Sequence, residues 1–136
     1  MWIVWSLLSA LFAGITAILA KSGVRDVDSN LATAIRTLVV LVLTWGIVLA
    51  RGISFSGVSP RTWFFLIASG LATGASWLCY FRALQLGEAS RVAPLDKLSV
   101  VIAIILAVWF LHEQLTWHQW VGGGLIVLGS MVIALG

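Results

Sequence analysis

The sequence predicts an all-α, polytopic membrane protein with five transmembrane helices in a single domain over residues 1–136. Of its 136 residues, 61% are hydrophobic and only 10% are charged, whereas about 25% of the residues of a soluble domain are charged. The apolar residues also form long uncharged stretches, each able to cross the roughly 30 Å hydrocarbon core of a bilayer as a helix. We expect these helices at about residues 2–21, 30–50, 62–84, 93–112 and 117–135.

The first predicted helix is uncharged until Lys21, which ends it. Ser9, Ala13 and Ala17 recur at every fourth position. Small side chains at this spacing let two membrane helices approach closely, so we predict a packing face here. The stretch has no basic n-region and is long enough to span a bilayer, so it is not a good signal peptide.

The second helix is expected to begin near Asp28, Ser29 and Asn30, which are all good N-cap residues. It carries Arg36 about two turns inside its start. An arginine at the centre of a span costs about 2.5–3.5 kcal/mol on insertion scales. Two interpretations follow: the guanidinium faces a polar interior, or it snorkels to the headgroups.

The third helix combines a packing motif with an aromatic end. Gly70 and Gly74 form a G-x-x-x-G pattern, which predicts close packing against another helix. Trp77 and Tyr80 follow toward the far end. They either line a substrate cavity or anchor the helix at the membrane interface, where tryptophan and tyrosine are enriched.

The fourth helix begins at a proline beside two charges, Pro94, Asp96 and Lys97, and continues uncharged to Glu113. Ionisable groups near the apolar layer indicate a functional site, and a proline-broken helix is a common way to build one in carriers. The alternative is structural. Pro94 would then be a helix-start proline, Asp96 would favour the helix dipole, and Lys97 would snorkel.

The remaining residues indicate neither catalysis nor metal binding. The glycine run of the fifth helix, which includes Gly122, suits tight packing, because no Walker lysine follows it. Cys79 has no second cysteine to pair with. His112, Glu113 and His118 are more typical of a polar rim than of a zinc site. We therefore expect no enzyme activity, no catalytic residue, no metal and no cofactor.

Tryptophans and basic residues are expected to favour opposite ends of the helices. Alternating spans place Trp77 at one interface and the other tryptophans at the opposite one: Trp2, Trp5, Trp45, Trp63, Trp109, Trp117 and Trp120. The Trp-poor side carries Lys21, Arg25, Arg82 and Arg91, whereas the Trp-rich side carries Arg51 and Arg61. The positive-inside rule therefore weakly places the loops near residues 25 and 90 in the cytoplasm, and the bias is small enough to allow both orientations.

Arg36, Asp96 and Lys97 are expected at comparable depth toward the Trp-poor side, which predicts a polar cavity open to that side. Its positive charge favours an anionic or zwitterionic ligand. Eight scattered basic residues form no block, so nucleic acid is not an expected partner. The predicted substrate or ion pathway comprises Arg36, Asp96, Lys97, Pro94, Trp77, Tyr80 and Lys21. The predicted packing positions are Ser9, Ala13, Ala17, Gly70, Gly74 and Gly122.

The chain resembles the EamA domain of the drug/metabolite transporter superfamily over nearly its whole length. Individually loose motifs occur in a specific order: Trp5, Lys21, the run LATAIR ending at Arg36, the aromatic–Ala–Leu pattern of Tyr80, Ala83 and Leu84, then Pro94 and Glu113 before a glycine-bearing helix. Asp96 and Lys97 depart from the family, in which many members are apolar or small at these positions.

The resemblance implies secondary transport of small polar or amphipathic metabolites, such as amino acids, related solutes or drugs. Typical members contain two inverted repeats and ten spans, and this chain contains one such repeat. We therefore expect an oligomer of half-size subunits, a homodimer for which an antiparallel arrangement is one option, in the bacterial inner membrane. A heteromer and a parallel dimer stay open.

Two other classes of function are also considered. One is a non-transporting subunit, scaffold or lipid-handling helper in a hetero-complex. The other is a small-multidrug-resistance type cation exporter, which is less well supported because such exporters use a glutamate in the first helix and this chain has no acid there. Charges at depth are costly for a pure scaffold, and this favours the carrier.

Overall fold

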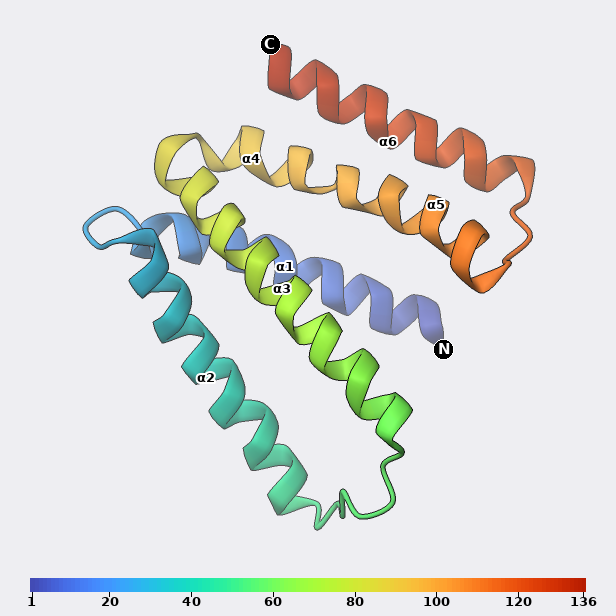
Figure 1. The fold of residues 1–136 in the computed structure, drawn as a ribbon. Coiled ribbons are helices and arrows are strands. Elements are labelled where there is room, and N and C mark those ends of the chain that lie inside the picture. The colour runs from blue at the N-terminus through green and yellow to red at the C-terminus, as the bar shows by residue number, and fades with distance from the viewer. The chain divides into compact units, whose positions relative to one another are not determined.

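The computed structural model of the protein describes residues 1–136 and contains helices but no strands (Figure 1). The helices are α1 (Trp2–Gly23), α2 (Ser29–Ala50), α3 (Pro60–Leu86), α4 (Ala89–Asp96), α5 (Leu98–Leu111) and α6 (Trp117–Leu135). They provide five segments that are long and apolar enough to cross a membrane, with α4 and α5 sharing one. The predicted all-α fold with five spans is therefore confirmed.

Burial follows the pattern expected of a chain surrounded by lipid. The buried hydrophobic side chains are few: Ala17, Val24, Phe81 and Leu84. Leucines, isoleucines and phenylalanines along the helices are instead mostly exposed. In water such a surface would drive aggregation, whereas in a bilayer it faces acyl chains.

The chain divides into two compact units, which we describe separately. The central unit is Ala20–Gln85, and the terminal unit joins Met1–Leu19 to Leu86–Gly136. Helix α2 of the central unit begins after Asp28, whose Oδ1 accepts hydrogen bonds from the backbone N–H groups of Asn30 (2.8 Å) and Leu31 (3.4 Å). Of the three candidates, Asp28 is therefore the N-cap of α2, because its carboxylate accepts hydrogen bonds from backbone N–H groups that have no partner within the helix.

Helices α2 and α3 are joined by a turn over residues 51–59 in which Gly52 and Gly57 adopt positive φ values of 60° and 96°. These are conformations that glycine adopts without steric cost. Helix α3 then starts at Pro60, at a position where proline's missing N–H is not needed. It covers two residues more at each end than the predicted range 62–84.

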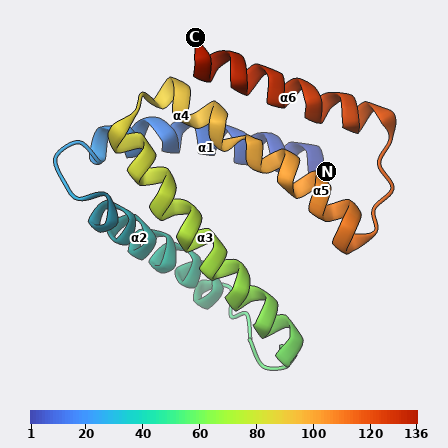
Figure 2. The same ribbon diagram turned by 45° about the horizontal axis from the view of Figure 1, so that its top comes forward.

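In the terminal unit, α6 runs antiparallel to the segment formed by α4 and α5 and lies beside it in both views (Figures 1 and 2). The packing face of α6 contains Gly123, which is buried. A Cβ atom added to Gly123 would lie 3.5 Å from Ile104 Cδ1 on α5, so a small residue allows this close approach.

The fourth span differs from the single helix predicted at about residues 93–112. It begins at Ala89 and is interrupted at Lys97. The Pro94 carbonyl accepts from the Lys97 N–H (3.1 Å) and from the Ser130 hydroxyl of α6 (2.9 Å). In a continuous α-helix this carbonyl would accept from residue 98. A side chain inserted into the backbone ladder is a known cause of such breaks.

Candidate functional site

Arg36 is held against two aromatic rings in the central unit. Its Cζ lies 4.2 Å from the centroid of the Trp77 ring and 5.4 Å from that of Phe81. The two rings lie one turn apart on α3. Arg36 lies on α2, about 10 Å along the helix axis from the first residue of α2. A cation–π contact contributes about 0.5–1 kcal/mol where the cation stays exposed, which offsets a part of the roughly 2.5–3.5 kcal/mol that insertion scales assign to an arginine at the centre of a span.

The orientation of Arg36 bears on whether it snorkels. Phe81 lies nearer than Trp77 to the end of α3, yet the guanidinium is closer to Trp77, the ring farther from that end. A snorkelling arginine would instead extend toward the helix ends and the headgroups. The two distances show that the guanidinium lies over the ring farther from this end of α3, and whether Arg36 faces a polar interior stays a prediction.

Arg36 has no acidic partner within the described contacts of its side chain, which are the two rings. Tyr80 lies on the same face of α3, between Trp77 and Leu84, and interacts electrostatically with Arg36. The central unit thus brings together three predicted pathway residues, Arg36, Trp77 and Tyr80, and adds Phe81, which the sequence analysis did not single out.

The predicted pathway residue Lys21 lies at the end of the same unit, where its Nζ donates a hydrogen bond to the Leu84 carbonyl. Carbonyls in the last turn of a helix have no intrahelical partner. A cation there satisfies such a carbonyl and also favours the negative end of the helix dipole. In this contact Lys21 fixes the end of α1 to the end of α3.

Gln85 ties the loop between α1 and α2 to α3, a role that the sequence did not reveal. Its Nε2 donates to the carbonyls of Val24 (3.3 Å) and Val27 (2.9 Å), and its Oε1 accepts from Arg82 (2.8 Å). The only sequence signal was a polar amide in the last turn of an apolar helix. Its partners are backbone atoms, which no pattern of residue types identifies.

Five side chains near this end of α1, α2 and α3 are buried. We call this group the end cluster, and its members are Val24, Ser29, Thr33, Phe81 and Leu84. Val24 and Leu84 are fully buried, and the Thr33 hydroxyl donates to the Ser29 carbonyl. Phe81 belongs to the end cluster and is also one of the two rings against Arg36. The packing of the end cluster therefore helps to hold the ring that contacts the arginine.

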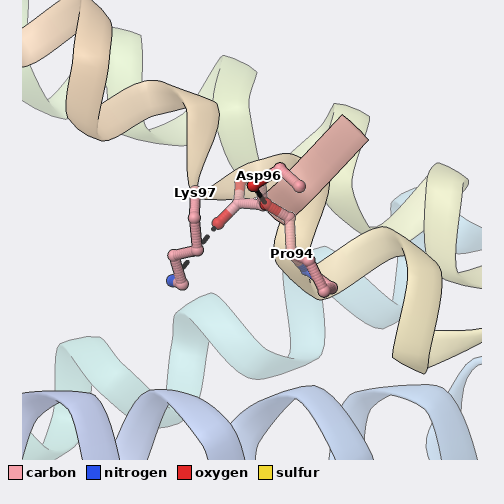
Figure 3. Close-up of polar contacts among 4 residues, drawn as sticks. Pro94, Asp96 and Lys97 are labelled. Atoms are coloured by element: carbon pink, nitrogen blue, oxygen red, sulfur yellow. Dashed lines mark hydrogen bonds and ion pairs between the residues drawn. The ribbon is translucent and has the colours of Figure 1, made fainter. Parts of the chain in front are cut away.

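Pro94, Asp96 and Lys97 lie in the terminal unit, at the break between α4 and α5 (Figure 3). Lys97 Nζ is 3.6 Å from Asp96 Oδ2, and the two side chains keep 54% and 39% of their exposed surface. Exposed ion pairs contribute about 0–1 kcal/mol in water. The pair therefore neutralises two charges locally without adding much stability.

The break also depends on a residue that the sequence analysis missed. Ser130 is buried on α6, and its hydroxyl reaches the Pro94 carbonyl. Gly123 lies on the same face of α6, because it comes seven residues before Ser130 and seven residues make about two helical turns. A serine among small residues in an apolar helix is a typical polar contact between membrane helices and could have been found.

The predicted packing positions are exposed to different degrees within the chain. Ala17 is buried, and Lys21 one turn later is half-buried. Ser9, Ala13 and Gly70 are exposed. Gly74 and Gly122 are half-buried, and no atom lies within 4 Å of a Cβ added at either. Their role as contacts to another helix or subunit stays a prediction.

Comparisons with known proteins add family information. The chain matches the EamA-like transporter family over residues 1–135. It is 52% identical over 136 residues to an uncharacterized transporter in cobO 3'region from Sinorhizobium sp, covering 98% of this chain and 96% of that protein. No solved structure matches the chain.

Two more relatives match about half of the chain. A probable 4-amino-4-deoxy-L-arabinose-phosphoundecaprenol flippase subunit ArnE from Aeromonas salmonicida is 34% identical over 68 residues, which are 50% of this chain and 60% of that protein. The human magnesium transporter NIPA3 is 40% identical over 65 residues, which are 48% of this chain and only 16% of that protein.

Proposed function

Because this chain belongs to the EamA-like transporter family, and is thus an integral membrane protein of a transporter class rather than of an enzyme class, we propose that it is a secondary transporter of small polar or amphipathic metabolites. The observation that carries this proposal is the guanidinium of Arg36 inside a membrane-spanning helix, over the rings of Trp77 and Phe81. A charge kept at that depth is costly and is typical of a solute pathway.

Each unit has its own candidate residues, and their proposed roles differ. In the central unit, Arg36 binds the solute, with Trp77 and Tyr80 lining its surroundings. Lys21 adds positive charge at the end of this unit. In the terminal unit, the interrupted helix at Pro94 carries Asp96 and Lys97, whose charges can separate when a solute or an ion replaces one partner of the pair.

We further propose that the transporter works as an oligomer of five-span subunits, a homodimer in the first instance, in the inner membrane of a bacterium. The Sinorhizobium relative supports the subunit size and a bacterial membrane, because the chain covers 96% of that protein. Small-residue positions such as Ser9 and Ala13 on α1 leave a face that can approach a second copy closely.

A counterflow assay tests the transport proposal. Purified protein is reconstituted in liposomes loaded with candidate metabolites, and entry of labelled solute is followed. We expect saturable counterflow that Arg36→Ala and Lys97→Ala abolish while the protein still inserts and assembles. Arg61→Ala is the matched control, because Arg61 also lies over a ring, 5.8 Å from Phe65, but at the start of α3. Equal loss in all three variants would refute the assigned roles.

A second candidate function is a membrane subunit that handles lipid-linked molecules in a hetero-complex and does not transport alone. The observation that favours it is the 34% identity to a protein named as a flippase subunit for a phosphoundecaprenol-linked sugar. This alternative predicts no counterflow by the purified protein and co-purification of a second membrane subunit from the native host. The carrier predicts flux by this chain alone.

A further inference from the structure

We infer that the transported solute carries an oxyanion, a carboxylate or a phosphate, and that the N–H edge of Arg36 binds this group. The inference rests on the proposed transport function and names the chemical class of its substrate. It depends on the N–H donors of the guanidinium that remain without a partner when the group lies over the rings of Trp77 and Phe81, which we call the aromatic platform.

Stacking engages the face of a guanidinium but not its hydrogen-bond donors. The five N–H bonds of arginine lie in the plane of the group and form a fork that matches carboxylate or phosphate oxygens. Arg36 lies over Trp77 at 4.2 Å and makes no ion pair. The platform thus fixes the plane of the fork and leaves its donors for a ligand.

These donors are also accessible. No buried side-chain nitrogen or oxygen lacks a hydrogen-bond partner in the structure. Since no hydrogen bond involves the Arg36 side chain, its nitrogen atoms must retain exposed surface. No group of this chain therefore has to be displaced before a ligand binds to them, whereas a buried and unsatisfied fork would have indicated a missing protein partner.

The charges around Arg36 favour an anion. The central unit contains six basic residues and two acidic ones, a formal charge of +4 from six minus two. One of the two acids, Asp28, is used as the cap of α2. The basic residues are Lys21, Arg25, Arg36, Arg51, Arg61 and Arg82, and the acidic ones are Asp26 and Asp28. Arg51 and Arg61 flank the turn at the other end of α2 and α3, so the field near Arg36 comes from Lys21, Arg25, Arg36 and Arg82 against the two acids. This field attracts anions and repels cations, so the magnesium in the human relative's name is a poor ligand for this site.

A binding experiment with matched probes tests the inference independently of flux. Benzoate, phenyl phosphate and benzylammonium share one apolar ring and differ in the head group. Each is titrated by calorimetry into purified protein in detergent. We expect saturable binding of benzoate, of phenyl phosphate or of both, and none of benzylammonium. The anion that binds more tightly identifies the head group as carboxylate or phosphate.

Variants then locate the binding group. Arg36→Gln should weaken anion binding at least about tenfold, because it removes charge-assisted hydrogen bonds. Arg61→Gln should bind as the wild type does. If Arg36→Gln does not fold, Arg36→Lys serves instead. It keeps the charge but loses the planar fork, so weaker binding of the anion is expected. Unchanged anion affinity in the folded Arg36 variant, or benzylammonium binding equal to that of the anions, would overturn the inference.

The two proposals fail in different ways. Counterflow of a cationic solute without any anion binding would refute the oxyanion site and leave transport standing. Anion binding that depends on Arg36, but with no counterflow of any benzoate-like or phosphate-bearing solute, would support the site and refute transport by this chain alone.

Discussion

Arg36 and Lys97 are both cations in membrane-spanning segments, yet the chain holds them in different ways. Arg36 is stabilised by the rings of Trp77 and Phe81 and has no acidic partner. Lys97 is neutralised by its sequence neighbour Asp96. Rings stabilise a cation without cancelling its charge, whereas a carboxylate cancels it. The central unit therefore keeps an uncancelled positive charge at Arg36, whereas in the terminal unit the Asp96–Lys97 pair has to separate before the charge of Lys97 is uncancelled.

The two units also differ in what holds their helices together. The central unit is fixed at one end by the end cluster and by hydrogen bonds from Lys21 and Gln85 to backbone carbonyls. The terminal unit is held along the length of α6, by close approach at Gly123 and by the Ser130 hydroxyl. A local substitution should therefore loosen one end of the central unit, whereas in the terminal unit it should separate α6 from α4 and α5.

The largest effect is expected from Leu84→Ala, which removes a fully buried side chain of the end cluster. The cavity should lower the free energy of unfolding by about 2–4 kcal/mol, because neighbouring side chains collapse only partly. Thermal unfolding in detergent measures the change. Leu71→Ala on the same helix is the matched control, since Leu71 is 73% exposed. A similar loss in both variants would contradict a packed end in the central unit.

A somewhat smaller effect is expected from Gly123→Leu in the terminal unit. Ile104 lies at ordinary contact distance from a Cβ at this position, so Gly123→Ala should be nearly neutral. A leucine should force α5 and α6 apart and cost about 1–3 kcal/mol. Gly124→Leu provides the control for the same assay, because no atom lies within 4 Å of its Cβ position. If leucine is tolerated equally at both positions, the close approach of these helices is not required for stability.

Gln85→Ala should have a more local consequence. It removes both hydrogen bonds to the loop between α1 and α2, at about 1 kcal/mol for a typical bond of this kind. The loop should open more often and become a better substrate for trypsin at Arg25, as limited proteolysis can measure. Gln114→Ala removes the same side chain from another loop and should leave this cleavage rate unchanged. If the wild type, Gln85→Ala and Gln114→Ala are cleaved at the same rate, the hydrogen bonds of Gln85 do not hold this loop closed.

The smallest effect is expected from Ser130→Ala, because hydrogen bonds between membrane helices contribute about 0.6 kcal/mol on average. The Pro94 carbonyl would then be free to accept from the Leu98 N–H, and the helix break should narrow. Slower hydrogen exchange of the Leu98 amide is the measurement. Ser6→Ala is the control, since Ser6 bonds to a carbonyl of its own helix. Exchange that stays as fast as in the wild type would mean that Pro94 alone causes the break.

The fold class and the five spans could be predicted from the sequence, because long uncharged stretches allow few alternatives in a bilayer. The family was recognised separately, by the resemblance that the ordered motifs carry, and the family match confirms it. The same reasoning identified Arg36 and the group at Pro94, Asp96 and Lys97, since charges at depth stand out. It could not find Gln85, Ser130 or Phe81. Their roles depend on which backbone carbonyl or cation lies opposite, and residue types do not encode such contacts.

By itself, the sequence determined that this chain crosses a membrane five times and carries a few costly charges, because hydropathy and helix length are local properties. Only the tertiary structure decided how each charge is held. It placed rings rather than a carboxylate against Arg36, since those contacts join α2 to α3 across many residues. It also placed the break of the fourth span at Lys97, beside a Pro94 carbonyl that accepts from the Ser130 hydroxyl, because that hydroxyl comes from a different helix.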